Sequence, residues 1–337
     1  MIPGSGSVSS AGRHPALVLG ILGVAAVLAL LSSVMLGSVA LTPNDVIVAL
    51  LGGGSDLARI LVVELRLPRS LAAFATGGLL AIAGALMQVL LRNPLADPYV
   101  LGISGGAAVG ALLAMISGLG LTWVSGSAFA GALLSTLIVF GLAHGTGSWT
   151  PTRLLLTGVV VAAGWGAVIT SLLAVRPSPE LPGMLYWLMG DLTHARGNTL
   201  PWLTLALIIG LTLPLGRSLN VLARGPLQAA VLGVAVRRLE WTVYLLAAVV
   251  TAVAVTTAGT IGFVGLIVPH MIRLIWGPDY RRLLPLTMIY GAAFLIVSDL
   301  IARTAISPGE LPVGVVTAFF GAPFFLYLLR RARMTYL

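Results

Sequence analysis

Long, uninterrupted apolar runs limit how this chain can fold more than any other feature. Ten runs have about the ~20 residues that an α-helix needs to cross the ~30 Å hydrocarbon core of a bilayer. Only helices and closed barrels satisfy their backbone polar groups there, and runs without alternation argue against a barrel. We therefore expect an all-α integral membrane protein with the lipid bilayer as its surroundings. The expected spans are 16–37, 67–91, 99–117, 123–143, 154–175, 198–215, 241–258, 260–276, 283–303 and 311–329.

Composition supports this fold class, and the distribution of charge predicts its orientation. Of 337 residues, 58% are hydrophobic and only 9% are charged, against about 25% charged in soluble domains. With ten spans both termini lie on one side of the membrane. That side then holds thirteen arginines and three acidic residues, and the other side holds six arginines and seven acidic residues. The positive-inside rule makes the terminal side cytoplasmic. The net charge of +9 thus reflects topology, and nucleic acid is not an expected partner.

The chain is expected to form one transmembrane domain over residues 1–337, with cytoplasmic tails at 1–15 and 330–337. The first apolar run is longer than the ~7–15 residues of a signal-peptide core, so we interpret it as a retained helix. No cysteine is present, which excludes disulfides and thiol chemistry.

The stretch RNPLADPYVLGISGG, residues 92–106, predicts a tight turn followed by a helix with a small-residue face. Its two prolines break any helix that enters from the preceding run, and Asn93 and Asp97 are suited to bond nearby backbone amides. Beyond the turn, Gly102, Gly106, Gly110 and Ala114 recur every four residues. Such a face lets another helix approach closely. We favour helix packing over the alternative, a glycine-lined path for a substrate.

The ionisable residues test possible energy sources. The chain has no lysine, so it lacks the residue that a phosphate-binding loop uses to reach phosphates. A carrier driven by an ion gradient usually keeps carboxylates near the middle of the bilayer. Glu64 and Glu310 fall outside the runs, and Asp299 lies four residues before Arg303, a spacing that suggests a local ion pair. A secondary transporter that works without an ATPase is therefore the less favoured alternative.

His270 is the one ionisable residue well inside a span. Pro269 before it leaves a carbonyl one turn earlier without its helical donor, and we favour a structural role for His270 at that kink over a substrate ligand or proton relay. The four histidines and ten acidic residues show no metal-ligand spacing such as two histidines four apart. We therefore expect neither an enzyme nor a bound metal or cofactor in this chain.

Several blocks resemble the FecCD-type permeases, the membrane subunits of ABC importers for iron chelates, haem and cobalamin. The resemblance runs in order from about residue 60 to residue 331, and the PHMIR and ELPVGVVTAFFGAPFF blocks are its most specific parts. The remaining blocks are RLPRSLAAF, GALMQVLLRNPLADPYVLGISGGAAVGALLA, LLLTGVVV, YWLMGDL, GTIGFVGLIVPHMIRLIWGPDYRRLLP, SDLIAR and LYLLRR.

The resemblance implies a cobalamin-permease-like bundle of ten helices in the bacterial inner membrane. It also implies a homodimer, two cytoplasmic ATP-binding subunits that hold the ATP and magnesium, and a periplasmic substrate-binding protein. Arginines of the family that face acidic residues of the binding protein match Arg66, Arg69 and Arg303 here. Local pairing of Arg66 with Glu64 and of Arg303 with Asp299 is the alternative. We favour docking, because these arginines oppose the positive-inside bias.

Residues 217–240 resemble the family's coupling loop, two short helices that press into the ATPase. The chain departs from the family where Pro226 and Leu227 replace an acidic pair, which puts the polar contacts to the ATPase in doubt. An ordinary basic inner loop is the alternative, and it leaves the Leu-Gly pattern unexplained. The positions assigned to coupling are Arg224, Gln228, Ala229, Ala230, Leu232 and Gly233.

The translocation path leaves a weaker signal. By resemblance, the turn at 148–153 and the segment at 176–197 lie near the cytoplasmic and external gates. Aromatic and arginine side chains suit a flat anionic cargo such as haem, but tryptophan and tyrosine also belong at membrane interfaces. We favour the interface for Tyr186 and Trp187, and ferric siderophore, haem and cobalamin all remain open as cargo. The residues assigned to the gates and path are Thr150, Pro151, Met189, His194 and Arg196.

Overall fold

The computed structural model describes residues 15–37, 39, 41–143, 150–175, 179–195, 197–306 and 309–333, and every regular element within them is a helix. Six helices are long and apolar enough to cross a membrane, and four shorter apolar helices accompany them. Each expected span coincides with one of these ten. They are α1 (Pro15–Met35), α4 (Leu67–Leu90), α5 (Ile103–Ile116), α6 (Leu121–Ala143), α7 (Pro151–Val175), α9 (Leu200–Leu222), α11 (Val236–Ala258), α12 (Val264–Trp276), α13 (Tyr280–Thr304) and α14 (Val313–Arg333).

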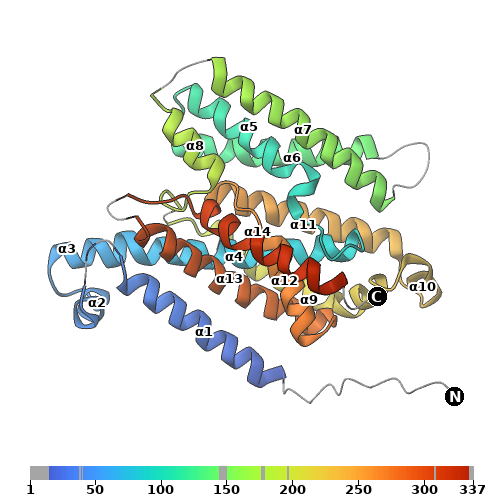
Figure 1. Cartoon of the computed structure of the whole chain (residues 1–337), viewed down its shortest axis with the longest axis horizontal. Helices are drawn as coiled ribbons and strands as arrows, with labels where there is room; N and C mark the ends of the chain where they lie inside the picture. Colours follow the sequence, from blue (N-terminus) through green and yellow to red (C-terminus); the bar gives the residue numbers. More distant parts are fainter. Residues whose placement is uncertain are drawn as a thin grey trace.

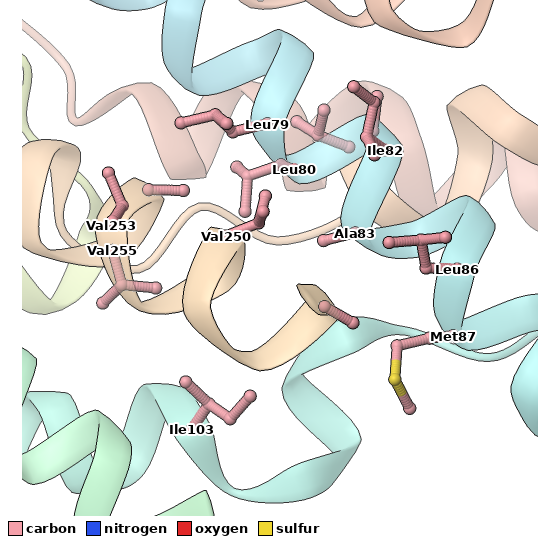
Figure 2. Packing of buried hydrophobic residues seen from close by; sticks show 14 of the residues in the cluster. Leu79, Leu80, Ile82, Ala83, Leu86, Met87, Ile103, Val250, Val253 and Val255 are labelled. Carbon is pink, nitrogen blue, oxygen red and sulfur yellow. The ribbon is translucent and has the colours of Figure 1, made fainter. Parts of the chain in front are cut away.

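Helix α4 forms the centre of the bundle. In its most apolar stretch 89% of the residues are buried, because α9, α11, α12 and α13 all contact it. Helices α5, α6 and α7 form a second group beside α11 (Figure 1). Figure 2 shows the core between the two groups, with Leu80 of α4 beside Val250 of α11. Helix α7 is the opposite case, since only 11% of its apolar stretch is buried.

Helices α4 and α12 cross at a contact between two glycines. A Cβ atom on Gly84 would overlap the carbonyl oxygen of Gly265, so only glycine fits at this crossing. Pro269, four residues after Gly265, leaves this same carbonyl without a helical donor. His270 Nδ1 is buried without a hydrogen-bond partner among the described residues. His270 Nδ1 therefore does not bond the carbonyl that Pro269 leaves without a helical donor.

The turn after α4 follows the sequence prediction, although the third helix begins late. Leu95 N donates to Asn93 Oδ1 at 2.9 Å, and Tyr99 N donates to Asp97 Oδ1 at 2.7 Å. A 3₁₀ helix, η2 (Pro98–Leu101), precedes α5, because Gly102 turns the backbone at a φ of +68°. The α-helix therefore starts at Ile103 rather than at residue 99.

The small-residue face of α5 serves packing. Gly106 and Gly110 lie against the backbone of α6, at the carbonyls of Gly131 and Ser127. Ala114, on the same face, is 3% exposed. The contact with α6 supports helix packing over a glycine-lined path.

The connection from α1 to α4 contains helices that hydropathy did not predict. They are α2 (Pro43–Leu50), α3 (Asp56–Arg59) and the π-helix η1 (Ile60–Arg66), which runs directly into α4. Arg59, Glu64 and Arg66 interrupt the apolar pattern. The apolar run therefore begins only at residue 67, whereas the continuous helix already includes α3 and η1. We call this end of the bundle, where α2, α3 and α8 (Leu181–Met189) also lie, the charged end (Figure 1).

The opposite end of the bundle, here called the α10 end, carries the connection between α9 and α11. Helix α9 continues to Leu222 and α11 begins at Val236, so the loop expected over 217–240 is shorter. It holds one short helix, α10 (Pro226–Val231), where the family resemblance implied two. The first residue of α1 and the last residue of α14 lie at this end as well (Figure 1). The expected tails fall mostly outside the described residues, and α14 extends to Arg333.

Candidate functional site

Arg69 at the start of α4 holds two carboxylates from distant parts of the chain. Its Nη2 lies 2.9 Å from Asp299 Oδ1 of α13, and its Nε donates to the same oxygen at 3.0 Å. Its Nη1 donates to Glu310 Oε2 at 2.7 Å. Glu310 belongs to the connection between α13 and α14. The sequence placed Arg69 at a docking surface but gave no indication of either partner.

The expected pair of Asp299 and Arg303 is confirmed, with 3.1 Å between Oδ2 and Nε. The guanidinium of Arg303 also donates to Ser33 of α1, at 2.9 Å to its carbonyl and 2.7 Å to its hydroxyl. The Ser33 hydroxyl in turn lies 2.7 Å from that of Ser70. One network of buried polar groups thus ties α1, α4 and α13 together.

Arg66 is bound differently from the expectation. Its guanidinium donates to the carbonyls of Val34 and Met35 at the end of α1, at 3.2 and 2.9 Å, and to the carbonyl of Val39 beyond the helix, at 2.5 Å. The suggested pair with Glu64 is absent from the ion pairs of the described residues, and Glu64 is exposed to solvent. A helix end leaves carbonyls without partners, and Arg66 satisfies those of α1.

The three arginines assigned to docking line one small cavity. Arg66, Arg69 and Arg303 are 5%, 8% and 6% exposed, so they do not project from the surface. They surround a cavity of about 140 Å³ that Thr193 and Glu310 also line. We call these three arginines with Asp299 and Glu310 the outer cluster. Its three cations and two anions give the cluster one net positive charge.

Two connections clamp the end of α8. Asp191 N donates to the carbonyl of Ala258 at 2.8 Å, and the Thr260 hydroxyl donates to the carbonyl of Leu188. On the other side Val313 N donates to the Gly190 carbonyl at 3.1 Å. Movement of α8 therefore requires movement of the segments before α12 and α14.

The start of α14 is in direct contact with the residue assigned to the external gate. A Cβ atom on Gly314 would overlap the carbonyl oxygen of Met189, so the two backbones touch. Tyr186, one turn earlier in α8, donates its hydroxyl to the Glu310 carbonyl at 3.1 Å. Helix α8 and the outer cluster are thus joined through the residues around Glu310.

A larger cavity of about 570 Å³ lies on the other face of α8, between the α5–α6 connection and the end of α11. Trp187, Asp191 and His194 are among its lining residues. His194 Nδ1 lies 3.3 Å from Asp191 Oδ2, and 68% of the His194 side chain is exposed. His194 and Met189 thus lie on different faces of this region. Arg196 falls outside the described residues.

At the α10 end, apolar side chains are exposed to solvent. Leu227, Val231 and Leu232 are 79%, 81% and 65% exposed. Of the positions assigned to coupling, Ala229 is buried, whereas Arg224, Gln228, Ala230, Leu232 and Gly233 are exposed. The sequence distinguishes Leu227 only as a departure from the family pattern, and it gives no signal for Val231. A concentrated apolar surface on a short polar-flanked helix is typical of an interaction site.

A hydrogen-bond network fixes α9 to α13 at this same end. Asn220 Nδ2 donates to Asp279 Oδ1 at 2.6 Å, and Tyr280 N donates to Asn220 Oδ1 at 2.7 Å. Burial acts to raise the pKa of Asp279, but the hydrogen bonds from Arg281 and Asn220 outweigh it and hold this pKa below its usual value of 3.8. The network anchors α9 immediately before the α10 connection.

Asp97 is a second carboxyl group at the α10 end, and it forms no ion pair with a cation of the described residues. Burial raises its pKa to about 6, and the hydrogen bond from the Tyr99 backbone amide opposes that rise only in part. Asp97 lies in the turn before η2 and bonds that amide at 2.7 Å.

The two residues assigned to the inner gate, Thr150 and Pro151, lie at the start of the exposed helix α7. The hydroxyl of Thr150 accepts a bond from Arg153 N at 3.3 Å, the arrangement of an N-cap, and Pro151 is the first helical residue, where proline is favoured.

Among the described residues no group of three or more histidine, aspartate or glutamate side chains has the arrangement of a metal site.

Comparison with protein families and curated proteins gives a consistent result. The FecCD transport family matches residues 25–331. The cobalamin import permease BtuC of Halobacterium salinarum is 45% identical over 82% of this chain and 75% of its own. The hemin transport permease HmuU of Yersinia pestis is 38% identical over 95% and 97%. The ferric dicitrate transport permease FecD of Escherichia coli is 40% identical over 81% and 86%.

A solved structure of a metal-chelate type ABC transporter in an inward-facing conformation resembles the fold of this chain. The TM-score is 0.84 at 29% identity, and the match covers 94% of this chain and all of the other.

Proposed function

The chain belongs to the FecCD transport family and is a permease subunit of an ABC importer; we propose that it carries a metal chelate inward through a homodimer. The curated relatives are named for cobalamin, ferric dicitrate and hemin. Ferric siderophore, haem and cobalamin are therefore the cargo class proposed here. ATP and magnesium are bound by the partner ATPase, which matches the absence of lysine from this chain.

All ten apolar helices cross the bacterial inner membrane in this proposal, with the α10 end in the cytoplasm. Thirteen of the nineteen arginines fall on the α10 side of the expected topology, as the positive-inside rule requires. The start of α1 and the end of α14 lie toward the same end of the bundle, which supports an even number of crossings (Figure 1). The charged end then faces the periplasm.

The observation that carries the proposal is the exposed apolar surface of α10. Leu227 and Val231 are about four-fifths exposed at the end where α9 and α11 leave the bilayer. An ATPase cleft that covers them would remove this apolar area from water. Arg224 and Gln228 flank the surface and supply polar contacts where the acidic pair of the family is missing. Closure of the ATPases would push on α10 and through it on α9.

A second copy of the chain would cover α7. Lipid tails cover any exposed apolar helix equally well, so exposure alone does not distinguish a partner from the bilayer. The position of the gate residues is more specific, since Thr150 and Pro151 begin α7, and α8 with Met189 follows it along the chain. A twofold axis beside α7 would therefore bring both gates of each copy onto one path.

The binding protein would dock at the charged end. The cavity lined by Arg66, Arg69 and Arg303 has room for a carboxylate and presents a net positive charge. Charge pairs at such a site mainly guide the encounter and fix the orientation of the partner. Because the arginines are buried, the acidic side chain of the partner has to enter the cavity.

Purification of the tagged chain from its host in mild detergent tests the proposal. We expect an ATP-binding subunit to accompany the chain, and the reconstituted complex to transport only with ATP. The double variant Leu227→Asp, Val231→Asp should lose the ATPase. Ile306→Asp, which changes an equally apolar side chain, 59% exposed at the charged end, should retain it. Purification of the chain alone, with transport driven by an ion gradient, would contradict the proposal.

A further inference from the structure

Arg69 has two carboxylate partners that differ in accessibility. The side chain of Asp299 is fully buried, whereas 44% of the Glu310 side chain is exposed. Asp299 is fixed within α13 and is also paired with Arg303. Glu310 lies in the connection outside the helices and is paired with Arg69 alone among the described ion pairs. Water and an incoming anion can reach the second pair but not the first, so only Glu310 is exchangeable.

Any carboxylate that enters the small cavity meets Glu310 at Arg69. The Nη1 atom donates to Glu310 at 2.7 Å, and among the described residues its one other hydrogen-bond partner is the Thr193 hydroxyl at 3.4 Å. Both residues line the cavity of about 140 Å³, together with Arg66 and Arg303. Displacement of Glu310 would raise the net charge of the remaining cluster by one. The cavity is therefore suited to replace an internal anion by an external one.

The backbone of this same connection holds α8. The Glu310 carbonyl accepts the Tyr186 hydroxyl at 3.1 Å, and Val313 N donates to Gly190 O at 3.1 Å. Leu311 N donates to Ala302 O at 2.9 Å, which fixes the connection to α13. A shift of Glu310 away from Arg69 therefore acts directly on the contacts at the end of α8.

We propose that Glu310 occupies, in the undocked permease, the position on Arg69 that a carboxylate of the binding protein takes on docking. The exchange frees the residues around Glu310 and loosens their hold on α8. Glu310 is thus a positioning residue that links docking to the external gate. This inference rests on the proposed docking at Arg66, Arg69 and Arg303, and the experiment below separates the two.

The affinity of the binding protein for the permease–ATPase complex in lipid nanodiscs tests the exchange. Glu310→Gln removes the competing charge, so binding should tighten about tenfold. Glu310→Asp keeps the charge and should bind within about twofold of the unchanged complex. Arg69→Gln removes the shared cation and should weaken binding about tenfold or more. Complexes are compared only after gel filtration shows that each variant retains its ATPase subunits.

Asp56→Asn is the electrostatic control. Asp56 is an exposed acidic residue of α3 at the same end of the bundle. A general change in surface charge would tighten binding equally for Asp56→Asn and Glu310→Gln, and this result would overturn the exchange. If neither Arg69→Gln nor Glu310→Gln alters affinity, docking at this site is itself wrong. If Arg69→Gln weakens binding and Glu310→Gln does not tighten it, docking stands and the exchange is wrong.

A probe on α8 tests the link to the gate. The chain has no cysteine, so Leu185→Cys gives a single labelling site on α8, where the native side chain is 39% exposed. A spin label there should become more mobile when the binding protein docks. In the Glu310→Gln background the label should already have this higher mobility in the absence of the binding protein. Tyr186→Phe should give part of that increase. An undocked Glu310→Gln spectrum identical to that of the unchanged permease would refute the link.

Discussion

At the charged end of the bundle, buried arginines and carboxylates form ion pairs with one another, whereas at the α10 end apolar side chains lie exposed to water. Asp299 is fully buried between Arg69 and Arg303, while Val231 is 81% exposed on a six-residue helix. The first arrangement contributes to the stability of the chain itself. The second contributes little to this chain and is suited to contact another protein. One end thus depends on interactions within the chain, and the other on its partner.

This difference has a physical origin in the surroundings. Charges removed from water at the charged end require partners in the same chain, because an unpaired buried charge is strongly destabilising. A short exposed helix such as α10 has no such requirement when it lies outside the bilayer, as proposed, since water then solvates its backbone and polar side chains. Apolar side chains there bury no area until a partner covers them.

The largest expected effect is loss of the buried carboxylate at the charged end. Asp299→Ala leaves Arg69 without its buried partner and Arg303 without its only ion pair among the described residues, so we expect the free energy of unfolding to fall by about 3–5 kcal/mol. Thermal unfolding in detergent measures the change. Glu310→Gln removes a half-exposed partner of the same arginine and should cost less than about 1 kcal/mol. Equal losses for the two variants would mean that burial does not distinguish the pairs.

A pH effect of intermediate size is expected from Asp97, a buried carboxyl group that has no ion pair among the described residues. Its pKa is raised from 3.8 to about 6 in the folded chain, so the folded state retains a proton that the unfolded state releases. Stability from this group is therefore highest below the unfolded value and falls as the pH rises through the window from about 4 to 6.

Asp97→Asn keeps the acceptor for the Tyr99 amide and removes the titration. This variant should match the unchanged chain near pH 4 and exceed its stability by about 1–3 kcal/mol at pH 7. Unfolding midpoints of both chains across this range provide the comparison. A difference that stays constant with pH would exclude Asp97 as the titrating group.

A smaller effect should follow from breaking the anchor of α9 at the α10 end. Asn220→Ala removes bonds to Asp279 and to the Tyr280 amide, and we expect a loss of about 1–2 kcal/mol. Asn198→Ala, which removes a single exposed bond to Leu200 N, should lose less. If the two variants lose the same free energy of unfolding, the bonds of Asn220 add no specific stability at the α10 end.

The smallest expected effect concerns the exposed apolar helix. The double variant Leu227→Asp, Val231→Asp should change the free energy of unfolding of the isolated chain by less than about 0.5 kcal/mol. The same unfolding assay measures it, with the ATPase absent. A loss of several kcal/mol would show that α10 belongs to the core of the chain, and the contrast between the two ends would disappear.

Local patterns in the sequence predicted a large part of the fold. Apolar runs predicted all ten apolar helices, six long and four shorter, because a backbone in lipid satisfies its polar groups within the helix itself. Spacing of four residues predicted the pair of Asp299 with Arg303 and the packing face of Gly106 and Gly110. Turn chemistry predicted the bonds of Asn93 and Asp97. All of these depend on residues that are near one another along the chain, or on one helix face.

Other features were decided only by how the helices pack. Arg69 meets Asp299 and Glu310 across 230 and 241 residues, and no local spacing contains that information. The direction of Arg66 toward the end of α1, the single helix of the α10 connection and the exposure of Val231 likewise follow from the tertiary arrangement. The sequence determined which segments form helices, and it predicted which side of the membrane carries the arginines. The rotation and depth of each helix, which set the partner of every buried charge, were determined by the packing of the whole bundle.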